Sequence, residues 1–315
     1  MSKSKISRKE QRKQQLTREK RRRTFLIAGI AGIVILAIVA AVFFRPAGGV
    51  TLRDIHGLSF SADGRQLIVP THDGLRFFAG GEWSAPDLPA NDYMGYVAMD
   101  EGFYSSGHPG SGSTLPNPLG LVKSTDGGET LQQLAFLGES DFHLMGVGYE
   151  SHAIYVLNGT PNSQLGTGLY YSLDDGETWS QVAMQGIATR PTNLAVHPTE
   201  MNQVALATEG GLYLSANYGD SFTRIGEAAL VTAVTFHPNG QALLFGAGQL
   251  SAYDLSSEQI SPVPSPAIAA GDAISYIAVN PVQDGEIALA TFNRDIYLSP
   301  DGGQTWQQIA RDGNG

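Results

Sequence analysis

The 315-residue chain has a formal net charge of −10, but this charge is divided very unevenly along the sequence. Residues 1–45 hold twelve Lys or Arg and two Glu, whereas the rest of the chain holds eight basic and twenty-eight acidic residues. So acidic a surface argues against nucleic acid as a partner, because phosphate binding needs a basic patch. The absence of cysteine excludes disulfides, thiolate catalysis and Cys-based metal sites.

The basic segment 1–23 is followed by an uncharged apolar run, residues 24–44. A helix of this length spans about 30 Å, the thickness of a bilayer core. A cleaved signal peptide is the alternative, but its apolar region is usually shorter and ends at a small-x-small site. We predict an uncleaved signal anchor in the cell membrane. The tail 1–23 is then cytoplasmic, residues 24–44 form one transmembrane helix, residues 45–53 are a linker, and the rest of the chain is extracytoplasmic.

A short motif repeats after this segment. The run STDGGETL at residue 124 recurs as SLDDGETW at 172, SANYGDSF at 215 and SPDGGQTW at 299. The spacings of 48, 43 and 84 residues place a degenerate copy near residue 257, in DLSSEQI, and another one period before the first, in FFAGGEW. The sequence therefore predicts six units of about 44 residues.

Alternating apolar segments lie in phase with the motif. Such segments, each interrupted by a turn, occur at residues 57–71, 93–107, 143–158, 193–208, 233–247 and 276–291. Each unit then contains four short strands, A to D, with the Ser/Asp/Gly run as the turn from C to D. This organisation is typical of an all-β, six-bladed β-propeller, which we predict for residues 54–315.

The pattern Ser-x-Asp-x-Gly-x-Thr-Trp resembles the Asp-box, or BNR repeat, of sialidases, sortilin-type receptors, photosystem assembly factors and bacterial proteins labelled glycosyl hydrolase. The resemblance implies a structural motif that lies on the face away from the ligand site. Its aspartates can accept backbone N–H bonds, its glycines permit positive φ, and its tryptophans can pack between blades. The predicted structural residues are Ser124, Asp126, Gly128, Thr130, Ser172, Asp174, Gly176, Thr178, Trp179, Ser215, Gly219, Ser299, Asp301, Gly303, Thr305 and Trp306.

The opposite face, where A strands start and B–C loops lie, is the predicted ligand face. His152, His197 and His237 fall in A–B turns on the motif face, where we expect structural roles. Blades 2 and 3 have long B–C loops, residues 105–120 and 158–168. Long loops on a rigid scaffold commonly carry function. The predicted ligand-binding residues are His56, His72, Asp73, Tyr93, Met94, His108, His143, Arg190, Glu209 and Arg294.

A metal ion is one hypothesis for this face. The imidazoles of His56, His72, His108 and His143 suit copper or zinc. The thioethers of Met94 and Met145 are predicted to lie nearby, and Asp54 or Asp73 could serve as a further ligand or as a partner of the ligating histidines. The alternative is that these histidines only bond the loops around the central channel.

The sequence favours a binding, sensing or assembly module whose ligand is an extracytoplasmic protein, a glycan or a metal ion. A cell-surface glycoside hydrolase is the alternative. The resemblance to sialidases implies an arginine triad, and Arg53, Arg190 and Arg294 map to the ligand face. However, Arg190-Pro191 is not the sialidase Arg-Ile-Pro motif and lies in blade 4. Carboxylates for hydrolysis would be Asp73, Glu209 and Asp295, so catalysis stays open.

Overall fold

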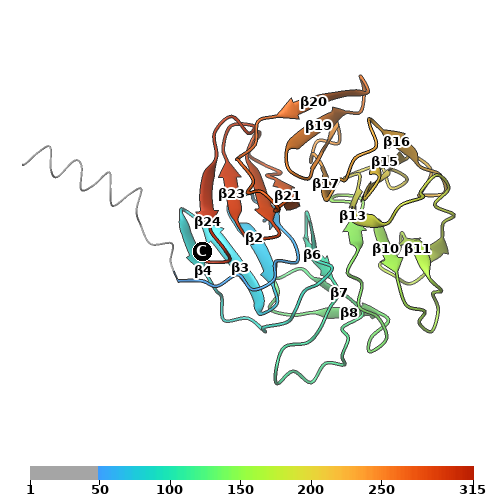
Figure 1. The fold of residues 1–315 in the computed structure, drawn as a ribbon. Helices are drawn as coiled ribbons and strands as arrows, with labels where there is room; N and C mark the ends of the chain where they lie inside the picture. Colours follow the sequence, from blue (N-terminus) through green and yellow to red (C-terminus); the bar gives the residue numbers. More distant parts are fainter. Residues whose placement is uncertain (1–48) are drawn as a thin grey trace, which may run out of the picture. The chain divides into compact units, whose positions relative to one another are not determined.

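Six antiparallel sheets of four strands each form a ring in the computed structural model, which describes residues 49–315 (Figure 1). The predicted cytoplasmic tail and transmembrane helix lie outside the described residues. Within the described part of the chain, no helix is long and apolar enough to cross a membrane. The prediction of an all-β, six-bladed propeller is confirmed.

Each blade consists of four consecutive strands. Blade 1 comprises β1 (Ser59–Phe60), β2 (Leu67–Thr71), β3 (Gly74–Ala79) and β4 (Glu82–Ser84). Blade 2 comprises β5 (Val97–Met99), β6 (Gly102–Ser105), β7 (Leu121–Ser124) and β8 (Gln132–Ala135). Blade 3 comprises β9 (Met145–Val147), β10 (Ile154–Asn158), β11 (Gly168–Ser172) and β12 (Ser180–Gln181). Blade 4 comprises β13 (Pro191–Val196), β14 (Val204–Thr208), β15 (Gly211–Ser215) and β16 (Thr223–Ile225). Blade 5 comprises β17 (Ala233–Phe236), β18 (Ala242–Gly246), β19 (Leu250–Asp254) and β20 (Gln259–Val263). Blade 6 comprises β21 (Ile274–Val279), β22 (Ile287–Thr291), β23 (Ile296–Ser299) and β24 (Gln307–Ala310).

The turn between the third and fourth strands is built around a buried serine hydroxyl. In blade 3, Ser172 Oγ donates to Asp174 Oδ1 at 2.8 Å and accepts from the amide of Gly176 at 2.9 Å. The Asp174 carboxylate accepts from the amide and hydroxyl of Thr178 at 2.9 and 2.6 Å. Gly176 has φ +86°, and a Cβ there would lie 2.9 Å from Leu121 of blade 2. The turn therefore needs glycine both for its backbone and for its packing on the preceding blade.

The same network recurs in the other predicted turns. The turns at 124–130 and 299–305 repeat every one of these bonds at 2.6–2.9 Å. In blade 4, Asn217 replaces the aspartate and accepts from Ser215 Oγ at 2.8 Å, while its amide donates to Ser221 Oγ at 2.9 Å. The geometry is kept because the asparagine amide donates where the threonine hydroxyl donates elsewhere.

The ring closes through contacts between blade 6 and the first described residues. Thr51 pairs with Asn314 in an antiparallel bridge, and Trp83 Nε1 donates to the carbonyl of Ile309 at 2.8 Å. In Figure 1 the C-terminus accordingly lies beside β4. The fold thus begins before Asp54 and includes residues 50–53, which we predicted to be linker.

Two A–B turns carry a polar side chain that ties one blade to the next. His197 Nδ1 accepts from the amide of Glu200 at 3.0 Å, and its Nε2 lies 2.9 Å from the carbonyl of Gly240 in blade 5. Asn280 plays the same part at the ring closure, where its amide donates to the carbonyl of Gly64 in blade 1 at 2.8 Å. The structural role predicted for His197 follows from these contacts.

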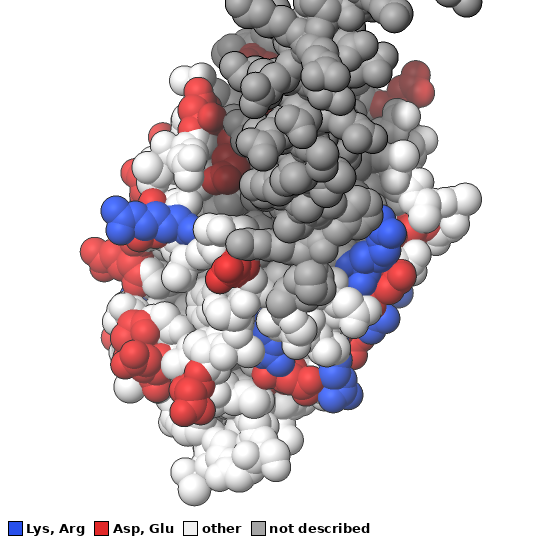
Figure 2. All heavy atoms as spheres, turned by 90° about the vertical axis from the view of Figure 1, so that its left-hand side faces the viewer, with Lys and Arg blue, Asp and Glu red and all other residues white. Residues whose placement is uncertain are grey.

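The charge of the described residues is spread over the surface. Figure 2 shows acidic side chains around the displayed face, with most of the basic side chains on its right and lower right, next to acidic ones. On the described part of that face, the basic residues do not gather into one patch.

Acid should destabilise the propeller partly through the serine-centred turns. Hydrogen bonds, first of all from the threonine that ends each turn, hold the pKa values of Asp126, Asp174 and Asp301 below their usual range, to about 2 for Asp126. A carboxyl whose pKa is lower in the folded state stabilises the fold above its unfolded pKa of about 4, and this stabilisation is lost as the pH falls through the folded value.

We therefore expect the triple variant Asp126→Asn, Asp174→Asn, Asp301→Asn to lose less stability than the wild type between about pH 4 and pH 2. Urea midpoints across this range measure the difference. The variant Glu129→Gln, Glu177→Gln, which changes exposed carboxyls in the same turns, is the control and should behave like the wild type. An equal loss in the triple variant and the wild type would contradict the prediction.

Candidate functional site

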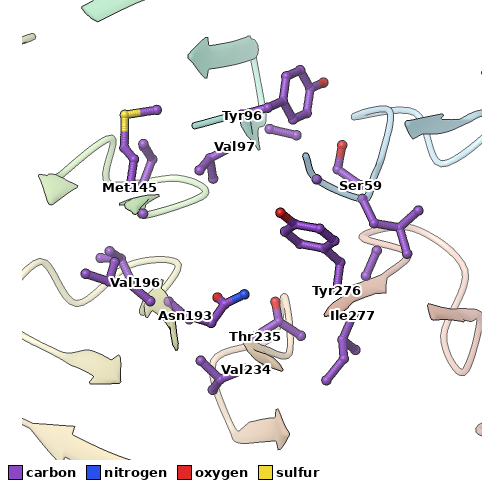
Figure 3. A pocket seen from close by; sticks show the side chains of 18 of the residues that line it. Ser59, Tyr96, Val97, Met145, Asn193, Val196, Val234, Thr235, Tyr276 and Ile277 are labelled. Atoms are coloured by element: carbon purple, nitrogen blue, oxygen red, sulfur yellow. The ribbon is translucent and has the colours of Figure 1, made fainter. Parts of the chain in front are cut away.

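A central cavity of about 210 Å³ lies where the first strands of all six blades converge. Figure 3 shows the Tyr276 ring and the Asn193 amide reaching toward its middle, with Met145 and Val196 along its wall. Burial raises the pKa of Tyr276 to about 12. The phenol is therefore neutral at physiological pH, and its hydroxyl can donate or accept a hydrogen bond inside the cavity.

One pair of predicted histidines lies at the rim of this cavity around a carboxylate. His56 Nε2 is 3.1 Å from Asp92 Oδ1, and His72 Nδ1 is 2.7 Å from Asp92 Oδ2. The Asp92 side chain is only 8% exposed, that of His56 15%, and that of His72 50%. Burial lowers the pKa of His56, against the opposing influence of Asp92. The group is therefore open to solvent on the His72 side only.

The other pair of predicted histidines shares a second carboxylate. His143 Nε2 lies 2.6 Å from Asp141 Oδ2, with hydrogen-bond geometry. His108 Nε2 lies 3.2 Å from the same oxygen, and its Nδ1 is 2.7 Å from Asn117 Oδ1. Asp141 therefore faces imidazoles from two blades.

The structure does not bring the four histidines to one point, as the four-histidine metal hypothesis requires. It forms two groups, which meet because Asp92 and His108 exchange two backbone hydrogen bonds of 2.9 Å. Sequence reasoning missed both carboxylates, although a signal was present. The segments Asp54-Ile-His56, Asp92-Tyr-Met94 and Asp141-Phe-His143 precede the first strands of three consecutive blades, so Asp-x-His/Met is itself a repeat.

The two long loops of the ligand face adjoin this rim. Asn117, in the loop of blade 2, contacts His108. In the loop of blade 3, Asn162 Nδ2 donates to Ser140 Oγ at 2.8 Å, next to Asp141. The expectation that these loops serve the ligand face is consistent with these contacts.

Two further predicted residues of blades 1 and 2 do not join the histidine groups. Tyr93 is 1% exposed and packs on Phe103 with ring centroids 5.6 Å apart, so it belongs to the core rather than to a ligand surface. Asp73 Oδ2 lies 3.3 Å from Arg53 Nη1, in an exposed pair. Met94, in contrast, lines the cavity.

The predicted residues of blades 4 and 6 lie apart from that rim. Arg190 and Glu209 are exposed and joined by a backbone hydrogen bond of 3.1 Å. The carbonyl of Arg294 accepts from Gly313 at 3.1 Å, where the ring closes. Asp295 Oδ1 accepts from the amide of Asp312 at 2.8 Å. The arginines and carboxylates considered for a hydrolase are therefore held within separate blades.

The remaining histidines bond within the turns of the other face, as expected. His152 Nε2 lies 2.6 Å from Asp100 Oδ1 of blade 2. His237 Nδ1 accepts from the amide of Asn239 at 3.3 Å. Both contacts hold A–B turns in place and leave these rings with structural roles.

Comparisons with known proteins concern the fold. No family model matches the chain, and no curated protein matches its sequence. A GH74 xyloglucanase from Xanthomonas campestris has a TM-score of 0.53 at 18% identity, over 84% of this chain and 46% of that one. YCF48 bound to a D1 peptide has a TM-score of 0.50 at 18% identity, over 84% of both chains.

The extracellular domain of the one component system BT4673 from B. thetaiotaomicron has a TM-score of 0.53 at 13% identity, over 84% of this chain and 35% of that one. The chain spans about half the length of the first two GH74 enzymes that it matches. These likenesses show the β-propeller fold.

Chemical modification should distinguish the histidines of the two faces. Diethyl pyrocarbonate attacks accessible, unprotonated ring nitrogens, so we expect His72 and His143 to react several-fold faster than His197. The first two side chains are 50% and 62% exposed, whereas His197 is 6% exposed and uses both ring nitrogens. Peptide mass spectrometry after short exposures measures the rates. If His197 reacted as fast as His143, its burial and the engagement of both its ring nitrogens would be wrong.

Proposed function

We propose that the chain is a membrane-anchored, extracytoplasmic recognition propeller of the Asp-box class that binds a polypeptide segment over the central cavity. One observation carries the proposal. The rim of blades 1–3 gathers two partly or fully buried carboxylates, four imidazoles and both long loops at the mouth of a cavity lined by all six blades. Polar groups that converge on one concave site are typical of binding sites.

Two comparisons support recognition rather than catalysis. YCF48, whose propeller matches this chain over 84% of both lengths, is seen with a bound peptide. The BT4673 match is to an extracellular domain of a signalling system. Membership of the Asp-box class is supported by four turns that share one hydrogen-bond network.

The hydrolase alternative is less well supported. The xyloglucanase match covers only 46% of that enzyme and shows the fold alone. Asp73 faces Arg53, and Asp295 accepts a bond from its own blade's C-terminal turn, so neither is held as a free acid over the cavity. A glycosidase needs two carboxyl groups at a controlled separation across the scissile bond, which these contacts do not provide.

Binding can be tested with the fragment 47–315, because residues 50–315 contain the whole ring and its closing contacts. We expect it to select extended peptides from a library. Replacing His143 or Asn193 with alanine should weaken this binding about tenfold or more, since each presents a polar group at the cavity or its mouth. His237→Ala, on the other face, should leave the affinity unchanged.

The glycoside hydrolase alternative is tested by incubating the fragment with xyloglucan and with sialosides. Released reducing ends and released sialic acid measure hydrolysis. Turnover above the blank that is lost on replacing a rim carboxylate would overturn the recognition proposal. Selection of glycans instead of peptides would show that the ligand is a glycan and not the proposed polypeptide.

The orientation of the chain can be tested because the native sequence has no cysteine. We expect a Thr160→Cys variant in intact cells to react with a membrane-impermeant maleimide, since Thr160 is exposed in the loop of blade 3. A Ser4→Cys variant should react only after permeabilisation, because its basic tail is predicted to remain cytoplasmic. Labelling of both variants in intact cells, or of neither, would contradict the predicted topology.

A further inference from the structure

Three side chains on the rim of blades 1 and 2 place their donor atoms around one point. Nitrogen atoms of His56 and His72 lie 3.1 and 2.7 Å from the two carboxylate oxygens of Asp92. One donor atom from each residue lies within 4.8 Å of the others. Ligand atoms that bind one ion at about 2.0–2.2 Å are roughly 3–4 Å apart. Small side-chain movements would therefore bring all three onto a single metal ion.

An ordinary hydrogen bond does not account for the contact between His56 and Asp92. His56 Nε2 and Asp92 Oδ1 are buried, and among the described residues neither atom has a hydrogen-bond partner. The two atoms are close, but the angle between them does not allow a hydrogen bond. Buried polar atoms are nearly always partnered in folded proteins. A cation held between the ring nitrogens and the carboxylate would satisfy both.

The three ligands are held by backbone pairing rather than by a free loop. The amides of His56 and His72 donate to carbonyls on adjacent segments at 3.0 and 2.8 Å. Asp92 is fixed by its two backbone bonds with His108. A binding geometry carried by hydrogen-bonded backbone segments is pre-organised, so little entropy is lost when an ion binds.

The geometry points to a divalent transition-metal site formed by His56, His72 and Asp92, for which zinc is the first ion to test. Two imidazoles and one carboxylate are ligands that zinc accepts when it keeps an open position for water or another donor. Imidazole also suits copper and nickel, and copper(II) should bind more tightly than zinc. The half-exposed His72 side chain leaves solvent access to this open position. Metal binding here does not depend on the proposed recognition of a polypeptide.

The second pair of histidines supplies a matched control. His143 already makes a hydrogen bond with Asp141, and His108 contacts both Asp141 and Asn117. Their Nε2 atoms both lie within 3.2 Å of Asp141 Oδ2, so the two rings already share this carboxylate rather than that of Asp92. The ligand set thus contains two of the four histidines of the sequence hypothesis and adds Asp92.

The test uses the fragment 47–315, prepared without a histidine tag and stripped with a chelator. We expect elemental analysis and titration calorimetry to show about one zinc ion per chain. The variant His56→Ala, His72→Ala and the variant Asp92→Asn should each lose about 100-fold or more in affinity, because a three-ligand site loses its geometry with any ligand. The variant His108→Ala, His143→Ala should stay within a few-fold of the wild type.

Two further measurements keep the result independent of folding. Cobalt(II) bound to the wild type should give visible d–d absorption that Asp92→Asn lacks. Zinc should raise the melting temperature of the wild type and of the His108→Ala, His143→Ala variant, but not that of Asp92→Asn. The asparagine variant is isosteric, and its circular dichroism reports whether it is folded.

Absence of zinc retention by the wild type would overturn the proposal. An equal loss of affinity in both double-histidine variants would also overturn it and return the ligands to the four-histidine set. The peptide assay, repeated with and without chelator, reports on recognition separately, so failure of one proposal leaves the other measurable.

Discussion

Closing six separate sheets into a ring requires each blade to bury its outer turn against the blade before it, and this packing is the constraint on which the other features depend. In blade 3, Gly176 lies against Leu121, and the Trp179 ring stands 5.6 Å from that of Phe136. Blade 6 repeats the contact, with Trp306 Nε1 donating to Pro264 O at 3.0 Å.

Blade 1 has no serine-centred turn, yet Trp83 makes the corresponding contact with Ile309 of blade 6. The closing interface is therefore an ordinary blade interface with one strand pairing added, between Thr51 and Asn314. Because the ring is closed without a disulfide, its stability depends on buried apolar area and on the satisfied hydrogen bonds of its turns. The same closure fixes where the first strand of each blade starts, and therefore the positions of the residues on the rim of blades 1–3.

The fold could be predicted because a repeat multiplies a weak signal. One Ser-x-Asp-x-Gly-x-Thr run is only a turn, but its recurrence at spacings near 44 residues predicts the blade count and the C–D position together. Even Asn217 and Ser221, which depart from the pattern, keep its bonds. The closure of the ring was harder to predict. The pairing of Thr51 with Asn314 joins residues from the two ends of the propeller sequence, and no repeat in the sequence indicates it.

The site was predicted only as a face. Mapping histidines by blade position predicted one face for His56, His72, His108 and His143, because strand alternation and loop position fix the face of a residue. It could not divide them into pairs, since that division depends on how blades 1, 2 and 3 pack. Tyr93 shows the same limit. It is adjacent to Met94, but side chains alternate, so one lines the cavity while the other enters the core.

The two carboxylates of the rim differ in a way that follows from chain position. Asp141 and His143 are two residues apart in the segment just before β9, so they hydrogen-bond to each other locally. Asp92 belongs to blade 2 and meets the histidines of blade 1 only after the two blades have packed. Its partners are oriented by the blade interface rather than by each other, which explains why His56 Nε2 lies close to Asp92 Oδ1 without a hydrogen bond between them. An ion bound there would join two blades through three bonds, so metal affinity and cohesion of the ring would be thermodynamically linked.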